Sequence, residues 1–280
     1  MPLDMQSKKT TSLNRDHLSV LVAVLLLGSV LFRFIELPNQ TWRLQLFGSP
    51  MEIRLTGTWL LTLLMIGLVC TGANLILHGH PHLADHPERP IYVSWILPGL
   101  LTGLSAYLLE QIVTGPVWIA GLLFAAVAIS LTISAEYTVV SPKSSGYPAT
   151  RLALNMLAYL LAFILFTVIY QTRSRSIITA TLMMLVAGVL ALDLLSVADT
   201  PFQRVILYSG VVALIIGECT WALNYWQISA FVAGLFLILI FYVIVNVAHQ
   251  YFLERLSWSV VVEFALVAIV ALIVVLFKAP

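Results

Sequence analysis

One carboxylate stands apart from the other ionisable residues because it lies inside a long apolar run. Glu218 falls within residues 203–223, which are otherwise apolar enough to cross a membrane. An ionisable group in such a helix is costly to insert, so it usually faces the bundle interior and has a partner. Trp221 and Tyr225 share its helical face by their spacing. Two interpretations stay open: a proton- or cation-binding carboxyl, or an interhelical hydrogen bond that fixes packing.

A second group of polar residues falls near one end of the predicted helices. In the segment 227–250, Tyr242, Asn246 and His249 are spaced i, i+4 and i+7 and form one polar stripe. Polar groups from many helices at one level could build an inward-facing pocket, although helix ends are also where polar residues cost least. The whole group of seven residues, drawn from six helices, is Asn74, Glu136, Asn155, Asp193, Asn246, His249 and Glu263.

A histidine-rich segment follows the second apolar run. His78, His80, His82 and His86 lie close together with Asp85. Imidazole and carboxylate groups at this density could bind a transition metal. The spacing matches no established zinc motif, and the neighbouring prolines are equally typical of an ordinary turn. Metal binding is therefore a weak hypothesis beside a plain loop.

The rest of the chain is dominated by apolar runs. Its 280 residues are 60% hydrophobic and 10% charged, with a mean hydropathy of +0.99. Soluble domains carry about a quarter charged residues, and about twenty apolar residues suffice to cross a bilayer as a helix. We therefore predict an all-α polytopic integral membrane protein with about nine transmembrane helices. They are placed at 18–35, 58–77, 92–112, 116–137, 151–171, 177–197, 203–223, 227–250 and 258–278.

Residues 1–17 form a cytoplasmic polar head in this prediction, and residues 18–280 form one helical transmembrane domain. The first external loop contains a small β-hairpin at about 42–55, because two alternating segments flank a predicted turn at Gly48-Ser49-Pro50. An irregular amphipathic loop is the alternative. With the N-terminus inside, eight Lys and Arg residues fall on the cytoplasmic side and six outside, which favours a cytoplasmic N-terminus.

Small residues indicate where helices pack closely. Gly99 and Gly103 form a G-x-x-x-G pattern in the third span, and Gly121 and Ala125 begin a similar face in the fourth. Val113 to Pro116 is a tight connection, so we expect these two spans to form an antiparallel hairpin whose small faces meet. A homodimer, or another membrane protein bound through Gly99 and Gly103, is the alternative use of the same face.

Several function classes lack sequence support. The chain contains no P-loop, no zinc-protease motif and no nucleophile elbow. Cys70 and Cys219 lie inside apolar runs and indicate no disulfide framework. The net charge of +1 gives no reason to expect nucleic acid. We expect no cofactor, and a non-enzymatic role is favoured, with the lipid bilayer as the one partner that the composition requires.

Two stretches carry a family resemblance. Residues 217–226 (GECTWALNYW) and Trp95 to Gly99 (WILPG) resemble an uncharacterised family of bacterial multi-pass membrane proteins. The resemblance implies a bacterial inner-membrane setting. It implies no activity, substrate or site residue.

Three hypotheses for the function remain. The favoured one is a structural or accessory subunit that binds other membrane components. The second is a proton- or ion-coupled transporter that uses Glu218 and therefore requires a cavity reaching it. The third is a lipid-acting membrane enzyme in which Asp193, His249 and the histidine-rich segment converge.

Overall fold

The computed structural model describes nine segments of the chain and three isolated positions. The segments are residues 15–34, 40–46, 49–55, 57–80, 91–141, 146–172, 176–196, 201–226 and 228–253, and the isolated positions are 262, 266 and 269. The chain divides into two compact units, Met1–Arg151 and Leu152–Pro280.

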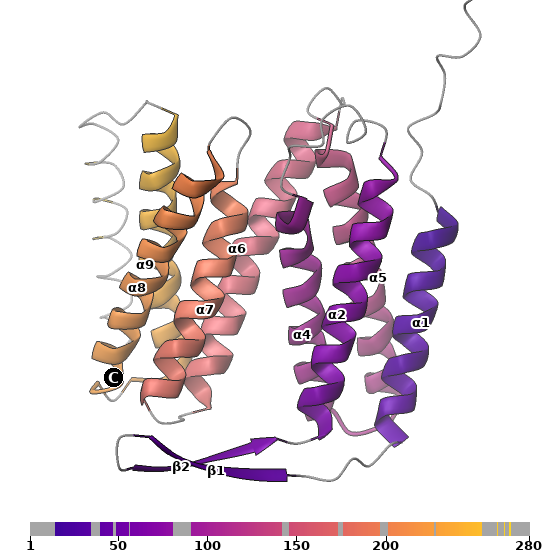
Figure 1. The fold of residues 1–280 in the computed structure, drawn as a ribbon, viewed down its shortest axis with the longest axis horizontal. Coiled ribbons are helices and arrows are strands. Elements are labelled where there is room, and N and C mark those ends of the chain that lie inside the picture. The colour runs from indigo at the N-terminus through magenta and orange to yellow at the C-terminus, as the bar shows by residue number, and fades with distance from the viewer. Residues whose placement is uncertain are drawn as a thin grey trace, which may run out of the picture. The chain divides into compact units, whose positions relative to one another are not determined.

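The first unit is a helical bundle with a β-hairpin inserted after its first helix. Its helices lie side by side in Figure 1. Their helical runs are bounded as the apolar segments predict, because backbone groups inside a membrane must be paired within the segment. The elements are α1 (Arg15–Phe34), β1 (Gln40–Leu46), β2 (Ser49–Leu55), α2 (Gly57–His78), the 3₁₀ helix η1 (Ile91–Trp95), α4 (Ile96–Gln111) and α5 (Pro116–Val139).

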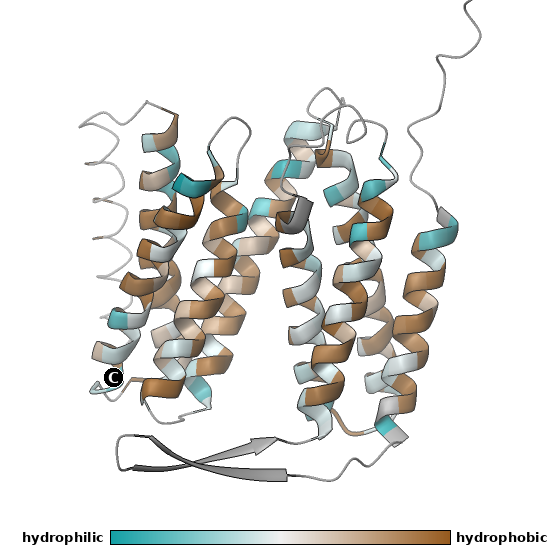
Figure 2. Ribbon diagram, in the orientation of Figure 1, coloured by the Kyte–Doolittle hydropathy of each residue, from teal (hydrophilic) through white to brown (hydrophobic). Residues whose placement is uncertain are grey.

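The second unit consists of helices in its described part. Its elements are α6 (Tyr147–Gln171), whose first residues belong to the first unit, α7 (Ser176–Leu195), α8 (Phe202–Leu223) and α9 (Ala230–Phe252). Figure 2 shows apolar residues along the middle of these helices and hydrophilic ones mainly near their ends. This distribution is what a helix that crosses a hydrocarbon layer requires.

The prediction of nine spans is not supported. Within the described residues, seven helical segments are long and apolar enough to cross a membrane. The apolar part of α1, Asp16–Leu31, is shorter than the others. It would extend about 24 Å at 1.5 Å per residue, less than the roughly 30 Å of a bilayer core. The predicted ninth span, 258–278, lies outside the described segments.

Of two predicted helix connections, the one before α5 agrees with the structure and the one after α8 does not. Pro116 begins α5 directly after Gly115, as the tight connection predicts. The connection after α8 is longer than expected, because α9 begins at Ala230 and not at 227. Ser229 causes this later start: its side chain accepts a hydrogen bond from the Val232 backbone N–H and caps the helix.

The two strands pair antiparallel, and their register differs from the predicted turn. Thr41 pairs with Arg54, and Leu44 pairs with Met51. Ser49 and Pro50, which the sequence places in the turn, belong to β2 and pair with Leu46 and Gln45. A two-stranded ribbon has an unpaired edge on each strand, so a proline without a backbone N–H can be accommodated there.

Glycines in the first unit set a helix contact that differs from the predicted one. A side chain added at Gly99 would meet Cys70, and one at Gly103 would meet Ile66; both neighbours belong to α2. The G-x-x-x-G face of α4 therefore packs on α2 and not on α5. On the predicted α5 face, a side chain added at Gly121 would meet Leu109 of α4 and Ile112 directly after that helix. Both contacts follow the rule that small residues permit close helix approach.

A polar contact closes the same unit at the α4–α5 connection. Arg33, in the last turn of α1, donates from Nε to the Thr114 hydroxyl at 3.0 Å and from Nη2 to the Ile112 carbonyl at 3.2 Å. Carbonyls near a helix C-terminus lack an intrahelical donor, so a guanidinium is a suitable partner. Arg33 thereby ties α1 to the turn between two other helices.

Candidate functional site

The carboxylate of Glu218 does not face the bundle interior, contrary to the prediction. Glu218 is exposed on α8, and Trp221 on the same helical face is 54% exposed. Tyr225 and Trp226 follow directly after the helix and are 83% and 54% exposed. We call these four residues the α8 face. Because α8 is apolar around most of its circumference, hydrophobic periodicity does not reveal which side is inward.

The α8 face has a fixed position at the end of its helix. Tyr170 of α6 donates its hydroxyl hydrogen to the Leu223 carbonyl, the last residue of α8, at 2.8 Å. Glu218 lies five residues before this end, or about 7.5 Å along the axis. That depth is inside the helix but not at its centre, so the carboxylate's insertion cost is smaller than the mid-span value of about 3 kcal/mol.

Two other predicted carboxylates are buried instead. Asp193 on α7 is 3% exposed, and Glu136 on α5 is 4% exposed. Each is engaged in an interaction. A buried carboxylate with a partner is a normal interior group. The two residues belong to different units, so a single polar pocket shared by Asn74, Glu136, Asn155, Asp193, Asn246 and His249 stays a prediction. Glu263 lies outside the described residues.

The predicted polar stripe on α9 is completed by a residue from α6. Asn246 Nδ2 donates to the Tyr159 hydroxyl at 3.0 Å and to the Tyr242 carbonyl at 2.8 Å. The Tyr159 ring lies 5.4 Å from the Tyr242 ring and 6.1 Å from the Phe241 ring, measured between centroids. His249 is half-buried farther along α9. Tyr159 is not among the predicted site residues, because one tyrosine in an apolar helix looks like an ordinary core residue.

The two described histidines of the predicted metal site, His78 and His80, have different surroundings. His78 is exposed, and its Nδ1 is 2.9 Å from the Asn74 carbonyl. His80 is 4% exposed and packs edge-on against Tyr137, with 4.6 Å between ring centroids. In the part of the chain that the structure describes, no three His, Cys, Asp or Glu side chains gather as a metal site would require. His82 and His86 lie outside that part, so the metal hypothesis is not tested.

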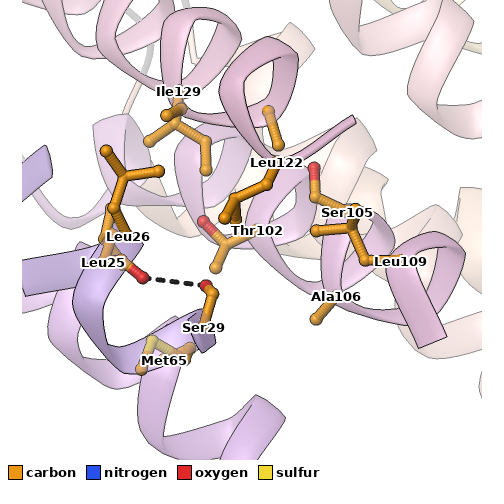
Figure 3. A pocket seen from close by; sticks show the side chains of 12 residues that line it. Leu25, Leu26, Ser29, Met65, Thr102, Ser105, Ala106, Leu109, Leu122 and Ile129 are labelled. Carbon is orange, nitrogen blue, oxygen red and sulfur yellow. Dashed lines mark hydrogen bonds between the residues drawn. The ribbon is translucent and has the colours of Figure 1, made fainter. Parts of the chain in front are cut away.

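A small cavity lies among four helices of the first unit. Its volume is about 40 Å³, far below the roughly 300 Å³ of a typical ligand pocket. Figure 3 shows the Ser29 hydroxyl bonded to the Leu25 carbonyl on its own helix, at 2.8 Å. Thr102 likewise donates to the Pro98 carbonyl at 2.7 Å. The remaining lining is mainly apolar, and Glu218 is not part of it. We interpret the cavity as a packing gap.

The apolar helices define the class to which the protein belongs. Seven helical segments apolar enough to cross a membrane indicate a multi-pass helical membrane protein. The family model described as "Protein of unknown function (DUF5656)" matches residues 37–278, and the chain belongs to that family. No curated protein and no solved structure matches the chain. The predicted membership of an uncharacterised family is therefore confirmed.

Proposed function

We propose that this protein is a structural or accessory subunit that binds another membrane protein through the α8 face. The observation that supports this role is the exposed carboxylate of Glu218 on a helix long and apolar enough to cross a membrane. Ionisable side chains in membrane helices almost always face protein or a water-filled cavity, because hydrocarbon solvates charge poorly. A partner that covers Glu218 removes this cost.

The chemistry of the α8 face defines the partner. A neighbouring helix would offer a basic, amide or hydroxyl group at the depth of Glu218. The rings of Trp221, Tyr225 and Trp226 supply exposed aromatic area beside the carboxylate. Exposed aromatic side chains of this kind are typical anchors of protein interfaces.

The two alternatives have less support from the geometry. A transporter that uses Glu218 needs a cavity that reaches this residue, and the cavity of about 40 Å³ described above is lined by other residues. A lipid-acting enzyme needs Asp193, His249 and the histidine-rich segment to converge, and half of those histidines lie outside the described residues. A subunit role requires only the exposed face.

The kind of membrane and the orientation of the chain are part of the same proposal. We infer a bacterial inner membrane with the N-terminus in the cytoplasm, on the excess of basic residues there and on the family resemblance. A reporter fused ahead of Met1 that is active only in the cytoplasm is expected to be active. Activity of a reporter that works only outside the cytoplasm would reverse the orientation.

The test is site-specific photo-crosslinking in native membranes. A photoreactive residue at position 221 is expected to crosslink to one discrete membrane protein that also co-purifies in constant proportion. Leu207 is the matched control, because it is 65% exposed on the same helix but near the opposite end. Position 207 is expected to label lipid.

A second variant links the crosslink to the carboxylate. Glu218→Leu is expected to reduce both the crosslink at position 221 and the co-purification, because the polar contact is lost. Equal crosslinking at 221 and 207, or crosslinks that join 221 only to its own chain, would contradict a partner-binding role.

A further inference from the structure

A second polar site lies in the Leu152–Pro280 unit, between α6 and α9. It consists of the Tyr159 hydroxyl and the Asn246 amide, which are joined by a 3.0 Å hydrogen bond. The aromatic rings of Phe241 and Tyr242 pack around Tyr159 and hold its phenol in place. Tyr242 is 37% exposed, so the cluster reaches the surface of the unit.

The hydrogen bonds of this pair leave one donor and one acceptor. Both hydrogens of Asn246 Nδ2 are used, one by the Tyr159 hydroxyl and the other by the Tyr242 carbonyl. Among hydrogen bonds within the described residues, the Tyr159 hydroxyl hydrogen has no acceptor and Asn246 Oδ1 has no donor. An amide and a phenol away from water are costly when they are incompletely bonded. The pair is therefore ready to accept a further polar group.

Geometry restricts what that group can be. The oxygen and nitrogen of an amide are about 2.2 Å apart, from its bond lengths, so Asn246 Oδ1 lies no more than about 5 Å from the Tyr159 hydroxyl oxygen. One external oxygen can thus reach both atoms at about 2.8 Å. That oxygen must accept from Tyr159 and donate to Asn246, which is the bonding pattern of a hydroxyl group.

The depth of the site along its helices and its lack of charge further restrict the class of ligand. Tyr159 is the middle residue of α6, and Asn246 lies six residues before the end of α9, or about 9 Å along the axis. Neither side chain carries a charge at neutral pH. A charged headgroup would lose its hydration at this depth without gaining a counter-ion. A neutral hydroxyl on an apolar skeleton avoids that loss.

We propose that Tyr159 and Asn246 form a binding site for a neutral lipid alcohol, such as a diacylglycerol. Tyr159 donates to the lipid hydroxyl oxygen, and the lipid hydroxyl donates to Asn246 Oδ1. The exposed part of the Tyr242 ring contacts the adjoining carbon skeleton. The site is independent of the α8 face and does not require a protein partner.

The test uses the full chain in phosphatidylcholine nanodiscs. The probe is a diacylglycerol with a photoreactive acyl chain, and the comparison is the same lipid with its hydroxyl acetylated. The free alcohol is expected to label α6 and α9 about three- to tenfold more strongly, since it makes two neutral hydrogen bonds that the ester cannot make together. Unlabelled dioleoylglycerol is expected to compete, and its acetate is not.

Variants assign the signal to the two side chains. Tyr159→Phe is expected to lower labelling about three- to tenfold, while its ring still packs against Phe241 and Tyr242. Asn246→Leu is expected to lower labelling at least as much. Tyr251→Phe, on the 53% exposed tyrosine near the end of α9, is the control and is expected to label like the natural protein.

Three results would overturn the lipid site. The first is equal labelling by the alcohol and the acetate, which is expected if only water bonds the pair. The second is unchanged labelling in Tyr159→Phe while the variant still unfolds in a single cooperative transition. The third is labelling confined to helices other than α6 and α9. The α8-face crosslinks do not change under any of these results, so the two proposals fail separately.

Discussion

The polar side chains at the cavity of the first unit and those of the Tyr159–Asn246 pair in the second unit are satisfied in different ways. In the first unit, Ser29 and Thr102 line a cavity, yet both donate to carbonyls four residues earlier on their own helices. In the second unit, Asn246 reaches across to Tyr159 on another helix. Short hydroxyl side chains can bond locally, whereas amides and phenols extend beyond their own backbone. Long polar side chains therefore indicate binding sites better than short hydroxyl side chains do.

Two carboxylates of the second unit differ in their burial. Asp193 is 3% exposed on α7, and Glu218 is exposed on the adjacent helix α8. Both are single acidic residues in apolar helices, so composition treats them alike. Their surroundings assign them different roles: Asp193 supports the interior, and Glu218 is available to a partner.

The largest effect is expected where a helix contact has no space. Gly234 on α9 lies against Thr167 of α6, and an added side chain would also meet the Thr167 backbone at 3.3 Å. Gly234→Leu is expected to destabilise the protein by about 3 kcal/mol or more, or to prevent its accumulation, because backbone cannot move aside as a side chain can. Thermal unfolding in detergent measures the effect.

Gly210 on α8 is the matched control for this substitution. A side chain added there meets no atom within 4 Å. Gly210→Leu is expected to leave stability unchanged or to raise it by up to about 1 kcal/mol, because leucine has the higher helix propensity. Equal losses for the two variants would show that the α6–α9 contact is not tighter than the exposed surface.

The next effect tests the two carboxylates. Asp193→Ala is expected to lower stability by about 1–3 kcal/mol, because it leaves the polar partner of a buried group unsatisfied. Glu218→Ala is expected to change the stability of the purified protein by no more than about 0.5 kcal/mol. Thermal unfolding of both purified variants provides the measurement. A larger loss for Glu218→Ala would place Glu218 in the interior and remove the basis of the α8 face.

The sequence predicts well at which residues most helices begin and end. Hydropathy places α2, α5 and α8 within about two residues of their ends, because membrane thickness sets span length. The start of α9 was wrong by three residues, since a single capping serine within an apolar context is a weak signal. Membership of an uncharacterised family was also predicted, and a model of such a family matches residues 37–278.

Rotation of the helices about their own axes could not be predicted in the same way. Glu218 was expected inside and lies outside, and Gly99 was expected to face α5 and faces α2. A helix that is apolar on all sides carries little periodic signal, so its inward face depends on packing against neighbours. Tyr159 was missed for a related reason: its partner is 87 residues away in the chain.

A smaller effect concerns the glycines of α4. Gly103→Ala is expected to cost less than about 1 kcal/mol, because the atom it would meet at 3.1 Å is the flexible end of Ile66. Gly67→Ala on α2 is the control, since nothing lies within 4 Å of the added carbon. It is expected to be neutral or slightly stabilising in thermal unfolding. Compensation of the Gly103→Ala loss by Ile66→Val would sharpen the assignment of this face to α2.

The smallest effect is expected at the self-bonded hydroxyl of the first unit. Thr102→Val keeps the shape of the side chain and removes a hydrogen bond to a carbonyl that already belongs to the α4 backbone ladder. Its stability is expected to change by no more than about 0.5 kcal/mol. Tyr159→Phe is expected to lower stability by about 1 kcal/mol, because Asn246 Nδ2 loses an acceptor, and to lose diacylglycerol labelling, whereas Thr102→Val is expected to keep it. If Thr102→Val also lost labelling, the contrast between locally bonded hydroxyls and the outward phenol–amide pair would fail, because a locally satisfied hydroxyl has no hydrogen left for a ligand.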